Sequence, residues 1–191
     1  MPTPTRRTSE ARDRLLRIAS GIFYAKGIHS VGIEEIVATA EVTRSTLYRH
    51  FPSKEDLVVA YLDSASLAER QQVAALIADD QSPEDAVRSV AAAVAAQIRN
   101  PVFRGCAFLN AAAEYPDADH PVRRAVRDHR QWFLDTVTTL VERLPDRPPA
   151  HAAELFVLLR DGAMAAGCLA DPDEVARTFL DGVEGLLAAR A

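Results

Sequence analysis

The chain has 191 residues, 48% of them hydrophobic, which is enough to bury a core and excludes a disordered protein. Its 22 Lys and Arg against 27 Asp and Glu give a net charge of −5, which alone argues weakly against a nucleic-acid partner. Two cysteines, Cys106 and Cys168, are too few for a disulfide framework or a four-thiolate zinc site. No apolar run approaches the roughly 20 residues that span a bilayer, and the N-terminus has no signal-peptide core. We therefore expect a cytoplasmic protein with no membrane partner.

The charge is unevenly distributed along the chain. Residues 1–54 carry nine basic and five acidic side chains, a net of +4, whereas the remainder carries 13 and 22, a net of −9. This asymmetry suggests that one end meets a polyanion and the other does not. The alternative is the ordinary fluctuation of charge along any chain.

Apolar residues recur at helical spacing along almost the whole chain, and no run alternates with the period of two that indicates a strand. Thr8 or Ser9 can cap the first helix, and Gly27 can close it in the left-handed conformation. The pattern predicts an all-α protein with about nine helices, over residues 9–26, 33–40, 44–50, 54–77, 83–99, 104–114, 119–144, 150–168 and 172–189.

Capping signals fix several of these ends. Thr43 is a good N-cap, and Ser53 with Asp56 resembles a capping box. Pro83 follows the candidate cap Ser82 at the first helical position, where its missing N–H has no consequence. Breaks are expected over residues 79–83 and at the prolines of 145–149.

Residues 33–50 have the proportions of a helix–turn–helix motif, with two short helices joined by a three-residue turn. The second helix of such a motif enters the DNA major groove, where Arg44 could pair with a guanine. Leu47 and Phe51 are four apart and should anchor this helix to the core. The alternative is a helical hairpin with solvated charges. The residues expected to contact DNA are Thr43, Arg44, Ser45, Thr46, Tyr48, Arg49, His50 and Lys54, with Arg6 and Arg7 on a flexible N-terminal arm.

The segment IEEIVATAEVTRSTLYRHFPSK, residues 33–54, together with the preceding helix, resembles the DNA-binding domain of the TetR (tetracycline-repressor-like) family of transcription regulators over about residues 9–62. The stretch GCAFLNAAAE, residues 105–114, is similar to one in some family members. The resemblance implies a helix–turn–helix domain over 1–53, with its basic arm, and an effector-binding and dimerisation domain over 54–191.

Glu41 departs from the family, which usually has glycine at this position of the turn. If the turn keeps a positive φ there, a residue with a Cβ costs on the order of 1 kcal/mol. The alternative is a turn that relaxes.

The last two predicted helices are apolar over a wide arc and contain small residues. A copy of the same pair could cover these faces across a two-fold axis, as a four-helix bundle. The alternative is that they close only the core of their own chain. The candidate interface residues are Leu155, Leu159, Gly162, Ala166, Val175, Phe179, Gly182, Val183 and Leu186.

The fourth to eighth predicted helices hold most of the aromatic residues, with a few polar groups among them. Helical pockets are mostly apolar with few convergent polar groups, which suits a moderately hydrophobic small molecule. The alternative for each residue is ordinary core or surface, and Cys106 is read as a small hydrophobe rather than a redox sensor. The candidate effector residues are Tyr61, Phe103, Cys106, Phe108, Asn110, Glu114, His129, Trp132, Phe133 and Arg160.

These features predict a ligand-responsive repressor that binds a palindromic operator as a homodimer and is released by a small hydrophobic molecule. We expect no cofactor, no metal and no enzymatic activity, because the chain has no nucleophile elbow, His-x-x-x-His pair, phosphate loop or dinucleotide glycine pattern. A helical protein–protein adaptor is the remaining alternative, and it would lack salt-dependent affinity for DNA.

Overall fold

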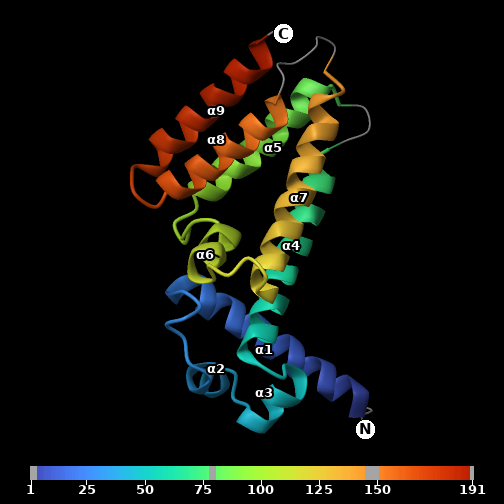
Figure 1. The fold of residues 1–191 in the computed structure, drawn as a ribbon, viewed down its shortest axis with the longest axis vertical. Helices are drawn as coiled ribbons and strands as arrows, with labels where there is room; N and C mark the ends of the chain where they lie inside the picture. The colour runs from blue at the N-terminus through green and yellow to red at the C-terminus, as the bar shows by residue number, and fades with distance from the viewer. Residues whose placement is uncertain (1–3, 78–80, 145–150, 190–191) are drawn as a thin grey trace. The chain divides into compact units, whose positions relative to one another are not determined.

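The computed structural model describes residues 4–77, 81–144 and 151–189, with side chains from Glu10 onward. Within these ranges the regular structure consists of nine helices and no strand, which confirms the all-α prediction (Figure 1). The helices are α1 Pro4–Lys26, α2 Ile33–Thr39, α3 Arg44–His50, α4 Lys54–Leu76, α5 Pro83–Ile98, α6 Ala107–Glu114, α7 Pro121–Val141, α8 Ala152–Ala166 and α9 Pro172–Ala188. None of them is long and apolar enough to cross a membrane.

The helix ends with local capping signals lie where the sequence predicted them. Thr43 Oγ1 accepts a hydrogen bond from Thr46 N at 3.1 Å, and Ser53 and Asp56 cap each other's backbone N–H at 3.0 Å. Ser82 caps α5 with Pro83 at its start, and Gly27 ends α1 with φ of 87°. The expected break at 145–149 and residues 79–80 of the preceding one lie outside the described ranges.

The start of α1 was predicted wrongly. The helix begins at Pro4 instead of at residue 9, so neither Thr8 nor Ser9 caps it. Proline suits a first helical turn, and no glycine or second proline interrupts the chain between there and Gly21. The backbone of Arg6 and Arg7 is therefore helical and does not form a flexible arm.

The chain divides into two compact units. Unit 1 holds residues 1–66 and 110–126, and unit 2 holds residues 67–109 and 127–191. The division passes through α4, α6 and α7, so each of these helices carries residues of both units. The domain boundary between residues 53 and 54 remains a prediction.

The core of unit 1 joins its first three helices to the beginning of α4. Phe23 lies with its ring centroid 6.0 Å from that of Tyr61, and Leu47 is fully buried. The buried apolar side chains shared by these helices include Leu15, Ala19, Phe23, Ile33, Ile36, Leu47, Phe51, Leu57, Val58, Tyr61 and Leu62.

Three helices of unit 2, α5, α8 and α9, pack against one another (Figure 1). Arg88 pairs with Glu184 at 2.8 Å and Arg99 with Asp173 at 2.8 Å, so α5 and α9 run antiparallel. At Gly167, a Cβ would lie 2.8 Å from Ile98 Cγ2, which is closer than packed atoms allow. Glycine therefore permits the close approach of this segment to the end of α5.

Candidate functional site

The helix–turn–helix of unit 1 is held by one apolar face of each short helix. Ile33 and Ile36 of α2 are buried, as is Leu47 of α3. Phe51, just after α3, is 3% exposed, and the guanidinium of Arg12 lies 5.1 Å from the centre of its ring. Both predicted anchors of α3, Leu47 and Phe51, are thus confirmed, and its opposite face is left to solvent.

The turn between α2 and α3 keeps the left-handed conformation that the sequence raised as a possibility. Glu41 has φ of 51°, and the turn is closed by hydrogen bonds from Glu41 N to Ala38 O at 3.2 Å and from Val42 N to Val37 O at 3.0 Å. The turn has not relaxed to suit a residue with a Cβ, so Glu41 carries backbone strain.

The exposed face of α3 presents hydrogen-bonding and charged groups. Arg44, 61% exposed, makes an ion pair with Glu34 of α2 at 2.7 Å, and its guanidinium lies 5.9 Å from the ring centre of Tyr48. Tyr48 is 39% exposed, and Ser45 and Arg49 are also exposed. These side chains can reach a groove or a phosphate without rearrangement of the core.

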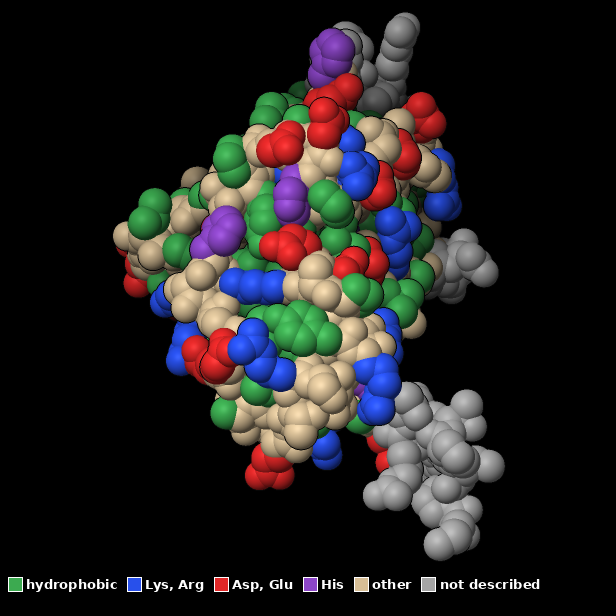
Figure 2. All heavy atoms as spheres, turned by 60° about the horizontal axis from the view of Figure 1, so that its bottom comes forward, with side chains coloured by type: hydrophobic (Ala, Val, Ile, Leu, Met, Phe, Trp, Pro, Cys, Tyr) green, Lys and Arg blue, Asp and Glu red, His purple; other side chains and the backbone are tan. Residues whose placement is uncertain are grey.

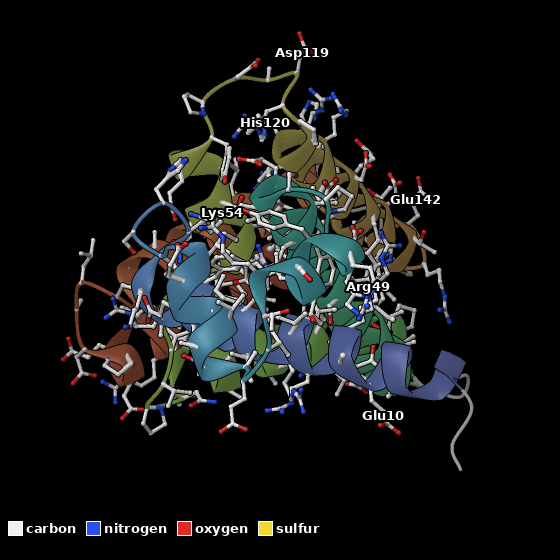
Figure 3. All side chains as sticks on the ribbon, turned by 90° about the horizontal axis from the view of Figure 1, so that it is seen from below. Glu10, Arg49, Lys54, Asp119, His120 and Glu142 are labelled. Atoms are coloured by element: carbon white, nitrogen blue, oxygen red, sulfur yellow. The ribbon has the colours of Figure 1, made fainter. Side chains whose placement is uncertain are left out.

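Two of the residues expected to contact DNA are more enclosed than the rest. Burial, followed by the charges of Arg49 and Arg12, lowers the pKa of His50, so its imidazole is neutral at pH 7. Its Nε2 is buried without a hydrogen-bond partner among the described atoms. Lys54 Nζ donates to Ile28 O at 2.7 Å, so the ammonium holds a loop of its own domain. Figure 3 shows Arg49 on α3 and Lys54 at the start of α4.

Acidic residues lie among the basic ones of residues 1–54, which we call the head. Lys26 pairs with Glu35 at 2.6 Å, in addition to the Arg44–Glu34 pair. Figure 2 shows Lys and Arg side chains beside Asp and Glu side chains on the face that it displays. Exposed pairs of this kind contribute about 0–1 kcal/mol, so a phosphate can displace the carboxylate at little cost.

In unit 2, part of the predicted effector set forms a buried polar cluster around Arg160. This guanidinium is 3% exposed and lies 5.0 Å from the ring centre of Phe133. Its Nη1 donates to Cys106 Sγ at 3.6 Å and to Asp161 Oδ1 at 3.1 Å, and its Nη2 donates to Glu69 Oε1 at 3.3 Å. Burial alone would lower the pKa of Arg160, but these three neighbours raise it above its ordinary value.

His129 forms the second half of this cluster. Its ring stacks on Phe108 with centroids 3.5 Å apart and lies 5.4 Å from the ring of Trp132. The guanidinium of Arg70 lies 4.5 Å from the centre of the Trp132 ring. Burial, followed by the charges of Arg160, Arg70 and Arg130, lowers the pKa of His129 to about 3. Glu69 lies 3.5 Å away, and burial raises the pKa of this carboxyl. His129 is therefore neutral at pH 7 and forms one polar side of the cluster.

The structure brings together Cys106, Phe108, His129, Trp132, Phe133 and Arg160, but it does not place the other candidates with them. Tyr61 packs on Phe23, Asn110 is exposed, and Glu114 binds the loop after α1, all within unit 1. Phe103 lies beside Gly167. All ten were selected by residue type, as aromatic and polar residues of the fourth to eighth predicted helices, and residue type does not indicate which face of a helix each one occupies. The small cavity that Glu69 and Phe133 line holds about 20 Å³, enough for about one water.

Sequence reasoning missed Glu69, Arg70 and Asp161. Glu69 had a readable signal, because it lies seven residues after the buried Leu62 and four before the buried Val73, on the apolar face of α4. A charged residue at such a position needs a partner. Asp161, which also pairs with Arg130, carried no such signal.

The outer face of α8 and α9 contains a shallow groove of about 420 Å³. Its lining includes five of the predicted interface residues, Leu159, Gly162, Ala166, Val175 and Phe179. Leu155 is 46% exposed, and a Cβ on Gly182 would touch Leu159 at 3.4 Å. Val183 and Leu186 are buried within unit 2 and do not line the groove, so their place in the interface remains a prediction.

Both parts of the chain match known families. The family described as "Bacterial regulatory proteins, tetR family" matches residues 15–61, and "Tetracyclin repressor-like, C-terminal domain" matches residues 83–180, more than half of the chain. A crystal structure of a TetR-family transcriptional regulator from Streptomyces coelicolor is similar, with 58% identity and a TM-score of 0.90, over 94% of this chain and 95% of that one.

Two curated relatives match in part. An uncharacterised helix–turn–helix regulator of Mycobacterium tuberculosis is 36% identical over 80 residues, 42% of this chain and 40% of its own length. The transcriptional repressor NemR of Escherichia coli is 29% identical over 122 residues, 61% of this chain and 60% of its own. These matches are to regulators rather than enzymes. The two family matches and the similarity of 94% of the chain to the Streptomyces coelicolor regulator agree, and the chain belongs to the TetR family of transcriptional regulators.

Proposed function

We propose that this chain is a repressor that binds a palindromic operator as a homodimer and is released by a small hydrophobic molecule. The observation that carries the proposal is the solvent face of α3, where Arg44, Ser45, Tyr48 and Arg49 project from a helix anchored by Leu47. Base readout needs such a helix, rigid on one side and polar on the other.

Arg44 is the side chain best suited to read a base. It is in the first turn of α3, where recognition helices contact base edges, and its guanidinium can form two parallel hydrogen bonds to a guanine. Its exposed pair with Glu34 orients it in the free protein. Because an exposed ion pair contributes little free energy in water, DNA can replace Glu34 as the partner of the guanidinium.

The groove of α8 and α9 supports the homodimer. It is lined mainly by apolar and small residues, and Leu158 at its edge is 64% exposed. A second copy of this face would bury those side chains in a four-helix bundle. A dimer also presents two recognition helices, which a palindromic operator requires.

The cluster around Arg160 supports an effector site. Its walls are aromatic, its polar groups converge from α4, α7 and α8, and its cavity is too small for an effector. A ligand must therefore part these side chains on binding. A ligand that binds one arrangement better than another shifts the population between them, as release from an operator requires. The similarity to a relative named as a repressor supports this direction of control.

Gel shift with a DNA duplex selected by the wild-type protein from a random pool tests the proposal. Arg44→Ala and Tyr48→Ala should each weaken binding by about 5- to 100-fold, since a good base contact contributes roughly 1–3 kcal/mol. Wild-type affinity should also fall steeply with salt. Arg143→Ala removes the same charge from an exposed position of unit 2 and should bind as wild type does.

Folded Arg44→Ala and Tyr48→Ala proteins with wild-type affinity would show that the DNA contacts lie elsewhere. A wild-type protein that selects no duplex at any salt concentration would favour the adaptor instead.

A further inference from the structure

One hydrogen-bonding edge of the buried Arg160 guanidinium is incompletely filled. A guanidinium holds five N–H donors in a fixed plane, and Nε and Nη2 direct theirs in parallel from the same edge. On this edge, Nε is buried without a hydrogen-bond partner among the described atoms, and Nη2 donates to Glu69 Oε1 at 3.3 Å. The edge therefore has a donor left over in a place that bulk water does not reach.

The rest of the guanidinium is occupied. Nη1 donates to Asp161 Oδ1 at 3.1 Å and to Cys106 Sγ at 3.6 Å. Asp161 also accepts from Arg130, so it is held between two guanidiniums. The ring of Phe133 lies 5.0 Å from the Arg160 guanidinium carbon. The edge formed by Nε and Nη2 is thus the one on which a further acceptor can bind, and a planar carboxylate fits it with two parallel hydrogen bonds.

Glu69 is the partner that can leave this edge. Its side chain is 23% exposed, so it can turn toward solvent, whereas the Arg160 side chain is 4% exposed and cannot. Burial raises the pKa of the Glu69 carboxyl, because its charged form is poorly solvated where it lies. A carboxylate bound to both Nε and Nη2 would replace one long hydrogen bond by two charge-assisted ones.

The charges of the cluster favour an anion over a cation. They are three guanidiniums and two carboxylates, those of Arg70, Arg130, Arg160, Glu69 and Asp161. After the larger effect of burial, the three guanidiniums lower the pKa of His129. The potential at this ring is therefore positive, which attracts an anion bound beside it and repels a cation.

The surroundings of this edge suit an apolar body. Phe108 stacks on His129, and the Trp132 ring lies 5.4 Å from His129 on another side. Phe133 and Glu69, which both contact Arg160, also line the cavity of about 20 Å³. When Glu69 turns outward, the space that it leaves adjoins this cavity. Aromatic walls around a single charged group are typical of sites for small amphipathic molecules.

We propose that the effector carries a carboxylate, which binds the Nε–Nη2 edge of Arg160 in place of Glu69. Its apolar body lies among the aromatic rings of Phe108, Trp132 and Phe133. All of these residues belong to unit 2. This inference rests on the proposed function and deepens it, because it names the chemical class of the effector.

Isothermal titration calorimetry on the full-length protein tests the ligand class without DNA. The probes are benzoate, 2-naphthoate and decanoate, each compared with its carboxamide and with the primary amine of the same carbon skeleton. The best acid should bind at least about tenfold more tightly than its amide, because hydrogen bonds to a charged group are the stronger ones, and the amines should not bind. An amide or an amine that binds as tightly as its acid would overturn the inference.

Two variants should change the affinity for the best acid in different directions. Glu69→Gln removes the competing charge and should strengthen binding about tenfold. Glu69→Gln combined with Arg160→Met leaves neither of the paired charges unmatched, so it should fold, and it should not prefer the acid to the amide. Glu142→Gln and Arg143→Met remove the same charges from exposed positions just after α7 and should bind as wild type does (Figure 3).

Circular dichroism checks that each variant is folded. A folded Glu69→Gln protein that binds none of the acids, or a folded double variant that still prefers the acid, would overturn the inference. Gel shift with the selected duplex then separates this result from the proposed function. An acid that binds through Arg160 but does not release the duplex would confirm the ligand class and contradict release by a ligand.

Discussion

Glu41 is the residue at which the fold accepts local strain. Its φ of 51° lies in the left-handed region, where a Cβ is unfavourable by about 1–2 kcal/mol. Glu41→Gly should therefore stabilise the protein by roughly 0.5–1 kcal/mol, after the greater freedom of glycine in the unfolded chain is set against it. We expect thermal unfolding followed by circular dichroism to show a rise of a few degrees.

Glu41→Ala separates the backbone effect from the charge. Alanine removes the carboxylate but keeps the Cβ, so it should give none of this gain. If alanine raises the melting temperature as much as glycine does, electrostatic repulsion rather than φ is the cause.

His129 makes stability depend on pH. Its pKa of about 3 in the folded protein lies below the value near 6.5 of an unfolded chain. Between these values the unfolded chain binds a proton that the folded protein does not, so stability falls as the pH drops. Through His129 alone, the free energy of unfolding falls by up to about 1.4 kcal/mol for each pH unit lost. Glu69 opposes this fall in part, because burial raises the pKa of its carboxyl and the folded protein therefore binds that proton more readily than the unfolded chain does.

Urea unfolding at about pH 7, 6 and 5 measures this dependence. His129→Gln is uncharged throughout, so its free energy of unfolding should fall less than that of the wild type over this range. Parallel curves for the two proteins would mean that His129 is protonated equally in the folded and unfolded states.

At the scale of elements, the sequence predicted best the ends that depend on neighbouring residues. Thr43, Ser53 and Ser82 cap helices through residues three positions away, so their signals are complete within a few letters. The start of α6 was missed by three residues, because Gly105 has φ of 88° and keeps that segment out of the helix. Composition alone does not reveal a glycine's φ.

Contacts between elements were harder to predict from the sequence than the ends of the helices. The anchors Leu47 and Phe51 were predictable because helical spacing determines which face of α3 is buried. The partners of Glu114 are 85 and 86 residues away, and no local pattern indicates them. Six of the ten effector candidates lie together and four do not, because residue type indicates chemistry but not which side chains a fold brings together.

At the scale of the whole molecule, the net charge of −5 is the sum of a basic segment, residues 1–54, and an acidic remainder. The basic head carries α3, and the acidic remainder has no long run of cations to attract a polyanion. A single head makes few contacts, so useful affinity requires two heads acting together. The groove of α8 and α9 is the surface on which that requirement can be tested.

Gly162 lies in this groove, and a Cβ there would meet nothing within 4 Å in its own chain. Gly162→Trp should therefore leave the fold intact, since glycine is a poor helix former, but its indole would occupy the space that a second copy needs. Light scattering after size exclusion should find the wild type dimeric and Gly162→Trp monomeric, with operator affinity reduced at least tenfold. Ala96→Trp adds the same ring to an exposed position of α5 outside the groove lining and should remain dimeric. A dimeric Gly162→Trp protein would place the interface elsewhere. A monomeric wild type would mean that each half-site of the operator binds one chain independently of the other.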